Sequence, residues 1–158
     1  MLILLFFAGC MGTIDAKIEE YIGKTPDCAV SVVDERPDKR IVVEVGLGDH
    51  IAFNMVPPIK DILSLKICQN PKIKQHLGNN EEIKVIIEDV KPIQVDSEFY
   101  TEFTLYLIGY IQEDKQKVSI RTSKTKKLIA ITRYIIQDMI NQCTDDFVKK
   151  IEEHLNSG

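Results

Sequence analysis

The second half of the chain contains a long segment, residues 99–113, in which apolar and polar side chains alternate. Its apolar parity is interrupted by Thr101 and Gly109 and otherwise consists of Phe99, Phe103, Leu105, Leu107 and Ile111. The other parity carries Tyr100, Thr104, Tyr106 and Tyr110. Successive side chains of a strand point to opposite faces, so the pattern predicts a strand with one buried and one partly wet face. Residues 83–88 alternate in the same way and residues 115–123 supply a partner strand, which is typical of an antiparallel sheet.

The last third of the chain has helical periodicity. Apolar residues recur there at three- and four-residue steps, at Leu128, Ile131, Ile135, Met139 and Ile140. This spacing predicts a helix with Ile135 and Met139 buried against the sheet and with Gln137 and Asp138 exposed on the opposite face. A second helical segment, residues 146–155, follows. The basic run at residues 124–127 is interpreted as a solvated helix start or loop.

The first half of the chain predicts shorter elements. Residues 28–33 are rich in valine and indicate a strand, residues 40–48 indicate an extended segment, and residues 50–56 a third short strand. Pro57 and Pro58 then open a central helix, because proline is tolerated in the first helical turn. Its apolar phase contains Ile59, Ile62, Leu63, Lys66 and Ile67. Pro71 ends or kinks this helix. We therefore predict an α+β fold, a mainly antiparallel sheet with a central helix and a long C-terminal helix packed on one face.

The chain opens with seven apolar residues, Leu2 to Ala8, followed by Gly9 and Cys10. This run is too short to span a membrane, which takes about 20 residues. An apolar segment that ends in small residues is typical of a secretory signal, and Ala8-Gly9-Cys10 resembles a bacterial lipoprotein cleavage site. We favour this interpretation over an uncleaved hydrophobic N-terminus or a core strand. It predicts a signal peptide at residues 1–9, a tether at residues 10–26 and a single α+β domain at residues 27–158.

Acylation of Cys10 would anchor the protein to a membrane. One acyl chain binds a bilayer weakly and two or more bind it firmly, since each buried CH₂ contributes about 0.8 kcal/mol. The residue after the cysteine is Met11 and not aspartate. In enteric-type sorting that pattern goes with the outer membrane, so the expected location is the envelope, at the outer membrane and facing the periplasm.

Composition and cysteine usage exclude several classes of function. The formal net charge is −4, whereas a nucleic-acid partner would favour a basic face, so we expect no nucleic-acid binding. Besides Cys10 there are three cysteines, Cys28, Cys68 and Cys143, so at most one disulfide forms among them and its pairing is open. No cysteine or histidine spacing fits a metal site, and we expect neither a metal nor a cofactor.

The polar segment after the first valine-rich strand concentrates charge around Asp34, Glu35, Arg36 and Asp38. Two carboxylates and an arginine can in principle perform acid–base chemistry, but no histidine or cysteine accompanies them at a useful spacing. Pairing of Arg36 with Asp34 or Asp38 to fix the strand exit is the favoured interpretation. A partner contact through Asp34 and Arg36 is the alternative. Catalysis is the least favoured, so we do not expect an enzyme.

The segments "FAGC", "VVDERPDK", "IKVIIEDVKPI", "FTLYLIGYI" and "CTDDFVKKIEEHL", in this order, resemble the YajG-type putative bacterial lipoprotein family and its relatives among envelope and transport-auxiliary lipoproteins. The similarity covers roughly residues 28 to 155 and rests on the order of elements and on "VVDERP". It implies an envelope location and an α+β architecture. It implies no reaction.

Two functional hypotheses follow. The first is a membrane-anchored envelope lipoprotein that acts as a non-catalytic binding or scaffolding module and contacts a protein partner through strand edges or through the wet face of Tyr100, Tyr106 and Tyr110. The second is a carrier of a lipid or small ligand, with a pocket between the sheet and the helices. A sizeable cavity between the sheet and residues 128–139 would favour the carrier, and a filled core would favour the binding module.

Overall fold

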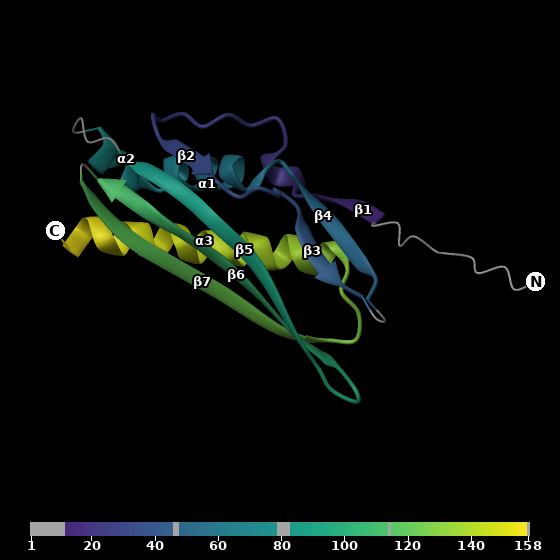
Figure 1. Ribbon diagram of the computed structural model, residues 1–158. Coiled ribbons are helices and arrows are strands. Elements are labelled where there is room, and N and C mark those ends of the chain that lie inside the picture. Colours follow the sequence, from purple (N-terminus) through teal and green to yellow (C-terminus); the bar gives the residue numbers. More distant parts are fainter. Residues whose placement is uncertain (1–11, 46–47, 79–82, 114, 158) are drawn as a thin grey trace, which may run out of the picture.

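A computed structural model describes residues 12–45, 48–78, 83–113 and 115–157 (Figure 1). One sheet has the order β1-β4-β3, formed by Gly12–Lys17, His50–Val56 and Ile41–Glu44. The other has the order β2-β5-β6-β7, formed by Ser31–Asp34, Lys84–Asp96, Thr101–Glu113 and Gln116–Leu128. The helices are η1 (Glu19–Tyr21), α1 (Ile59–Gln69), α2 (Pro71–Leu77) and α3 (Arg133–Ser157). The predicted α+β class, with its central and long C-terminal helices, is confirmed.

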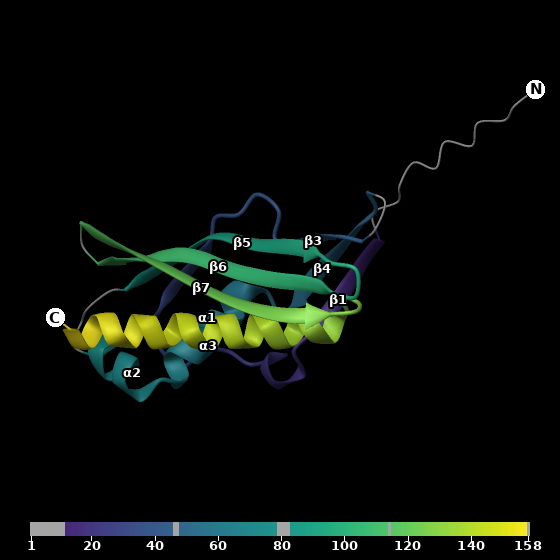
Figure 2. The same cartoon turned by 90° about the horizontal axis from the view of Figure 1, so that it is seen from below.

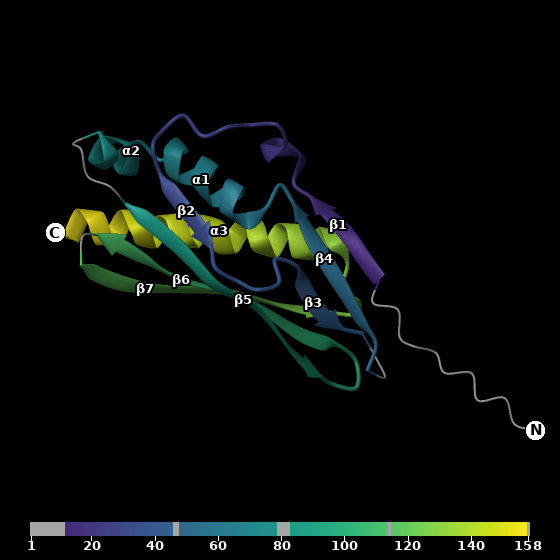
Figure 3. The same ribbon diagram turned by 45° about the horizontal axis from the view of Figure 1, so that its top comes forward.

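The predicted antiparallel arrangement holds for β5, β6 and β7, in which each long strand pairs with the next. Two parallel pairs, β1 with β4 and β2 with β5, make both sheets mixed. The sheets are linked where the Gln94 side chain on β5 donates to the Glu44 carbonyl on β3 (2.9 Å) and accepts from the Glu44 N–H (3.2 Å). Figure 3 shows β3 beside this part of β5. Figure 2 shows α1, α2 and α3 on one side of the four-stranded sheet.

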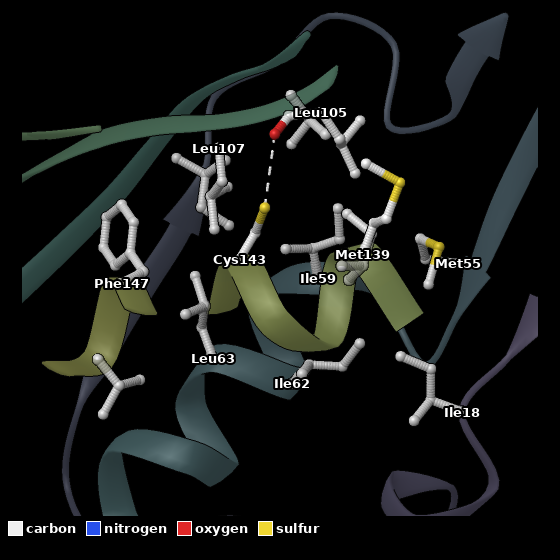
Figure 4. Packing of buried hydrophobic residues seen from close by; sticks show 14 of the residues in the cluster. Ile18, Met55, Ile59, Ile62, Leu63, Leu105, Leu107, Met139, Cys143 and Phe147 are labelled. Atoms are coloured by element: carbon white, nitrogen blue, oxygen red, sulfur yellow. Dashed lines mark hydrogen bonds between the residues drawn. The ribbon is translucent and has the colours of Figure 1, made fainter. Parts of the chain in front are cut away.

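The core lies between this sheet and the helices (Figure 4). Phe103, Leu105, Leu107 and Ile111 on β6 have no exposed surface, as their parity predicts. From α3 the core receives Ile136, Met139, Ile140, Cys143, Phe147 and Ile151, all fully buried. Gly109 interrupts the apolar parity for a packing reason: a Cβ there would lie 2.1 Å from the Ile86 carbonyl oxygen and 3.2 Å from the Phe147 ring. Because Gly109 has no side chain, the Phe147 ring of α3 can pack against β6 at this position.

Residues 10–26 are not simply a tether. Gly12–Lys17 form β1, whose Ala16 is fully buried, and Ile18 and Tyr21 are 9% exposed. The local sequence of β1 is a weak strand signal, and its strand structure depends on parallel pairing with β4, which is distant in sequence. The folded domain therefore includes residues that the sequence assigned to a linker. Cys10 and the predicted signal peptide lie outside the described residues.

The C-terminal helix differs from its prediction in three respects. Strand β7 continues to Leu128, so the basic run at residues 124–127 is strand and the helix begins only at Arg133. The helix then runs without a break to Ser157. Its buried stripe is also shifted by one residue: Ile136 is fully buried and Ile135 only half-buried. Met139 is buried and Asp138 exposed, as predicted.

Two further expectations are corrected at single residues. Gln137 is half-buried, because its side-chain amide donates to the Lys17 carbonyl oxygen at 2.6 Å. Phe99 shares the parity of the buried residues, but it precedes β6 in a turn and is 80% exposed.

One disulfide joins Cys28, which precedes β2, to Cys68 at the end of α1. Cys143 is a free thiol that is buried against β6, where it donates to the Leu105 carbonyl oxygen (3.5 Å; Figure 4). This one bridge among the described cysteines agrees with the limit that follows for the three cysteines other than Cys10. Within the described residues, no helix combines the length and the apolar character needed to cross a membrane.

Candidate functional site

Asp34 and Arg36 form a buried ion pair at the exit of β2. Their side chains are 5% and 4% exposed. The Arg36 Nε donates to Asp34 Oδ1 at 2.9 Å and its Nη2 to Oδ2 at 2.7 Å, which is the two-pronged arrangement that the guanidinium fork favours. The Arg36 backbone N–H also donates to Oδ1 (3.2 Å). The predicted pairing with Asp34 is therefore confirmed.

Neighbouring residues complete this turn. The Arg36 Nη2 donates to the Lys39 carbonyl oxygen at 3.1 Å, and Lys39 Nζ donates to the Asp34 carbonyl oxygen at 2.5 Å. Asp38 pairs with Arg40 instead of Arg36 (2.8 Å). Burial acts to raise the pKa of Asp34, but the hydrogen bonds and the positive charge of Arg36 outweigh it, so this pKa lies below its usual range. The carboxylate is held ionised as an acceptor and is poorly suited to take up a proton.

A cavity of about 370 Å³ lies beside this turn, between β2, β4 and the start of α1. It is lined by Val32, Val33, Asp34, Arg36, Lys39, Asn54, Met55, Pro58, Ile59 and Lys60. The cavity lies between strands and α1 and not between the sheet and residues 128–139, where buried side chains of β6 and α3 face one another. No group of three or more cysteine, histidine or acidic side chains gathers for a metal ion within the described residues.

The second candidate site is the sheet face opposite the helices. Three cations on β7 lie over three tyrosines, two on β6 and one just before it: Lys117 over Tyr110, Arg121 over Tyr106 and Lys127 over Tyr100. The distances to the ring centroids are 4.5, 4.4 and 4.8 Å. The structure therefore brings the three predicted tyrosines onto one face, and it places Asp34 and Arg36 apart from them at the β2 exit. We call the six residues the tyrosine–cation ladder.

Strand register explains the ladder. Tyr106 and Tyr110 stand directly opposite Ser123 and Ser119, whose small side chains leave the rings open. The cations come from the diagonal positions two residues along β7, which are within reach of long side chains. A cation over a tyrosine ring is attracted by the ring's negative face, by about 0.5–1 kcal/mol at an exposed site. The ladder thus orders long side chains on the sheet face that lies away from the described helices (Figure 2).

The spacing of the six residues in the sequence is a signal for the ladder that the sequence analysis passed over. The tyrosines are separated by six and then four residues, and the cations by four and then six. Two sets with reversed spacings meet pairwise when their strands run antiparallel. The mirrored spacing therefore indicates which cation lies over which tyrosine.

A buried lysine is a second feature that the sequence analysis passed over. Lys66 is 6% exposed, and its Nζ donates to Asp145 Oδ1 (2.6 Å), to Asn141 Oδ1 (2.6 Å) and to the Asn141 carbonyl oxygen (2.8 Å). Burial lowers its pKa, against the opposing effect of Asp145. The sequence signal for this burial was the position of the lysine, which shares the helical spacing of the apolar residues of the central helix. These bonds join α1 to α3 and leave Lys66 with a structural role.

Cys143 is not a reactive thiol. Burial raises its pKa to about 11, so the nucleophilic thiolate is scarce at neutral pH. Asp34 and Lys66 are engaged in ion pairs, so none of these three groups is an activated nucleophile.

Comparison with known proteins adds little to this picture. No family model matches the sequence. No curated protein matches it either. Among solved structures, the chain is similar to a protein of Xanthomonas campestris described as a member of family DUF330, with a TM-score of 0.48 and 11% sequence identity over 85% of this chain and 91% of that one. A likeness this distant carries no argument about function.

Proposed function

We propose that this protein is a membrane-anchored bacterial envelope lipoprotein that acts as a non-catalytic binding or scaffolding module in an assembly or transport system. Its anchor is Cys10, and its place is the outer membrane, facing the periplasm. We further propose a relationship to the YajG-type lipoproteins, on the order of elements and on the segment "VVDERP".

Two observations support an envelope location. Ala8-Gly9-Cys10 follows an apolar run, as in a lipoprotein signal. The Cys28–Cys68 disulfide is of a kind that persists in oxidising compartments such as the periplasm and is rare in the cytosol. The two observations are independent, because one concerns residues 1–10 and the other the folded domain.

The observation that carries the binding role is the tyrosine–cation ladder. Tyrosine and arginine are the residues that dominate binding energy at protein interfaces, and here Tyr106 and Arg121 occupy the middle rung of an uncovered face. Edge strand β7 has lysines at positions 117, 124, 126 and 127, which discourages another strand from adding to it. The proposed partner therefore meets the face of the sheet and not the β7 edge.

The test is capture of the partner from detergent-solubilised membranes with a photoreactive residue at position 106. The matched control carries the same residue at Lys149, which is 72% exposed on the opposite side, on α3. We expect one crosslinked species at position 106 that is lost in the Arg121→Glu background and absent at position 149. Equal crosslinking at both positions, or none at position 106, would contradict the binding role.

The cavity beside Arg36 favours a second candidate function, the carriage of a small ligand. Its volume of about 370 Å³ lies at the lower end of the range of ligand pockets, about 300–1,000 Å³. Native mass spectrometry of protein purified from membranes would show a bound small molecule, which Val33→Trp should displace by filling the cavity.

A further inference from the structure

The most exposed apolar side chains of the described residues gather in two turns. Val95, Phe99, Ile129 and Tyr134 are 60, 80, 95 and 64% exposed. Val95 and Phe99 belong to the β5–β6 hairpin end, and Ile129 and Tyr134 lie between β7 and the first turn of α3. Single exposed apolar residues are ordinary on a protein surface, but a cluster marks a contact surface.

The two turns lie side by side. Thr101, the first residue of β6, pairs with Leu128, the last residue of β7. Ile129 follows Leu128 directly, and Phe99 and Tyr100 directly precede Thr101. We call Val95, Phe99, Ile129 and Tyr134 the apolar tip; the adjacent Tyr100 lies under Lys127 and belongs to the ladder.

The apolar tip lies at the end of the molecule where β1 begins. In Figure 1 the start of β1, the β5–β6 turn and the β7–α3 turn all reach the right-hand end. At that end β1 begins above, the β5–β6 turn lies at the bottom, and the β7–α3 turn lies between them. The β6–β7 turn and the C-terminus lie at the opposite end.

The covalent chain holds this end close to Cys10. Strand β1 begins at Gly12, so only Met11 separates it from the cysteine. A chain spans at most about 3.3–3.6 Å per residue, which limits the distance between the Cys10 and Gly12 Cα atoms to roughly 7 Å. An acylated Cys10 lies in the headgroup layer, which is on the order of 5–8 Å thick on each side of a bilayer. With Cys10 as the proposed anchor, the described fold begins within this distance of the anchored residue, so β1 starts at the membrane surface.

We propose that the apolar tip inserts into the bilayer that holds the Cys10 lipid, so that the molecule stands on the membrane by this end and presents the ladder sideways. The proposal rests on the anchoring proposed above. Tyr134 is an aromatic residue of the kind that favours the membrane interface, and phenylalanine, as at position 99, is typical of the apolar face of segments that lie in it.

Charge at the tip favours an apolar contact over an electrostatic one. Glu102 on the hairpin lies opposite Lys127, Asp96 and Glu98 precede it, and Lys126 is paired with Asp138 of α3. The end therefore has no excess of positive charge, so its insertion should not require anionic lipid or depend on attraction that salt would screen. The apolar tip is thus proposed to bind the surface of a phospholipid bilayer in general and not to recognise an anionic headgroup.

The chain has no tryptophan, so one substitution creates a unique fluorescent reporter. The acylated protein carrying Phe99→Trp is reconstituted into phosphatidylcholine vesicles with brominated acyl chains. The matched control is Lys115→Trp in the exposed β6–β7 turn at the other end. We expect a blue shift and bromolipid quenching for Phe99→Trp, at low and high salt alike, and neither for Lys115→Trp. Adding Ile129→Asp should reduce the quenching at position 99.

Mass spectrometry of the same samples separates the two proposals. Protein that carries lipid on Cys10 and floats with the vesicles, yet shows equal and unquenched emission from both reporters, overturns the insertion and leaves the anchor intact. Protein without lipid on Cys10 overturns the anchor, and the insertion falls with it.

Discussion

Arg36 illustrates how a single side chain fixes a loop. Its guanidinium neutralises a carboxylate that is 5% exposed and also holds the Lys39 carbonyl oxygen. Removing one partner of a buried pair leaves the other charge without compensation, which costs about 3–5 kcal/mol. We expect Arg36→Ala to lower the free energy of unfolding by about this amount at pH 7, measured by urea denaturation. Arg40→Ala, which breaks an exposed pair, should change it by less than about 1 kcal/mol.

The same pair makes a prediction about pH. The pKa of Asp34 is lowered in the folded state, so its contribution to stability is fully present above the unfolded-state pKa, about 3.9. It is lost as the pH falls through the folded-state pKa. The difference in unfolding free energy between the wild type and Arg36→Ala should therefore narrow below about pH 4. A difference that stays constant down to pH 2 would contradict this account.

At the scale of the element, the phase of α3 decides which side chains support the core. Ile136 is fully buried and its neighbour Ile135 is half-buried. Truncating a buried isoleucine costs about 2–5 kcal/mol because it removes apolar contacts and leaves a cavity. We expect Ile136→Ala to lower the urea midpoint much more than Ile135→Ala does. If Ile135→Ala lowered the midpoint more than Ile136→Ala, the buried face of the helix would be the one that the sequence predicted.

The disulfide joins two elements that no hydrogen-bond ladder connects. It closes a loop with a sequence separation of 40 residues between the segment before β2 and the end of α1. Such a cross-link restricts the unfolded chain and stabilises the fold by about 2–4 kcal/mol. We expect the double variant Cys28→Ser/Cys68→Ser to lower the free energy of unfolding by this amount. The control is Cys143→Ser, which keeps the disulfide, so a reductant should destabilise it as much as it destabilises the wild type. Equal stability of the wild type with and without reductant would contradict the prediction.

At the scale of the whole molecule, the proposed anchor determines where the domain works. Changing Cys10 to Ser should leave an unprocessed or unlipidated precursor, because its thiol is the proposed acylation site. Intact mass and membrane fractionation measure the outcome, and Cys143→Ser is the control, since that thiol is buried. An unchanged mass and membrane partition in the Cys10→Ser variant would refute the anchor.

Alternation and periodicity in the sequence determined the α+β class, the three long strands and the existence of both main helices. These patterns succeed because each reports burial within one element, as on β6, where Leu105 and Leu107 face the core. The Asp34–Arg36 pair was also accessible, because its partners are two residues apart and meet through local geometry.

Only the tertiary structure decided what depends on residues far apart in the chain. Strand β1 depends on its pairing with β4. The Cys28–Cys68 disulfide was one of three possible pairings among Cys28, Cys68 and Cys143. The cations on β7 reach the tyrosines only in one register of β7 against β6. Which side chains of α3 are buried depends on how the helix packs against the sheet and α1, which its own periodicity does not fix to one residue. Local patterns specify which face of an element is buried. Which other elements pack against that face depends on the free energy of the whole packed molecule, and no local pattern contains that information.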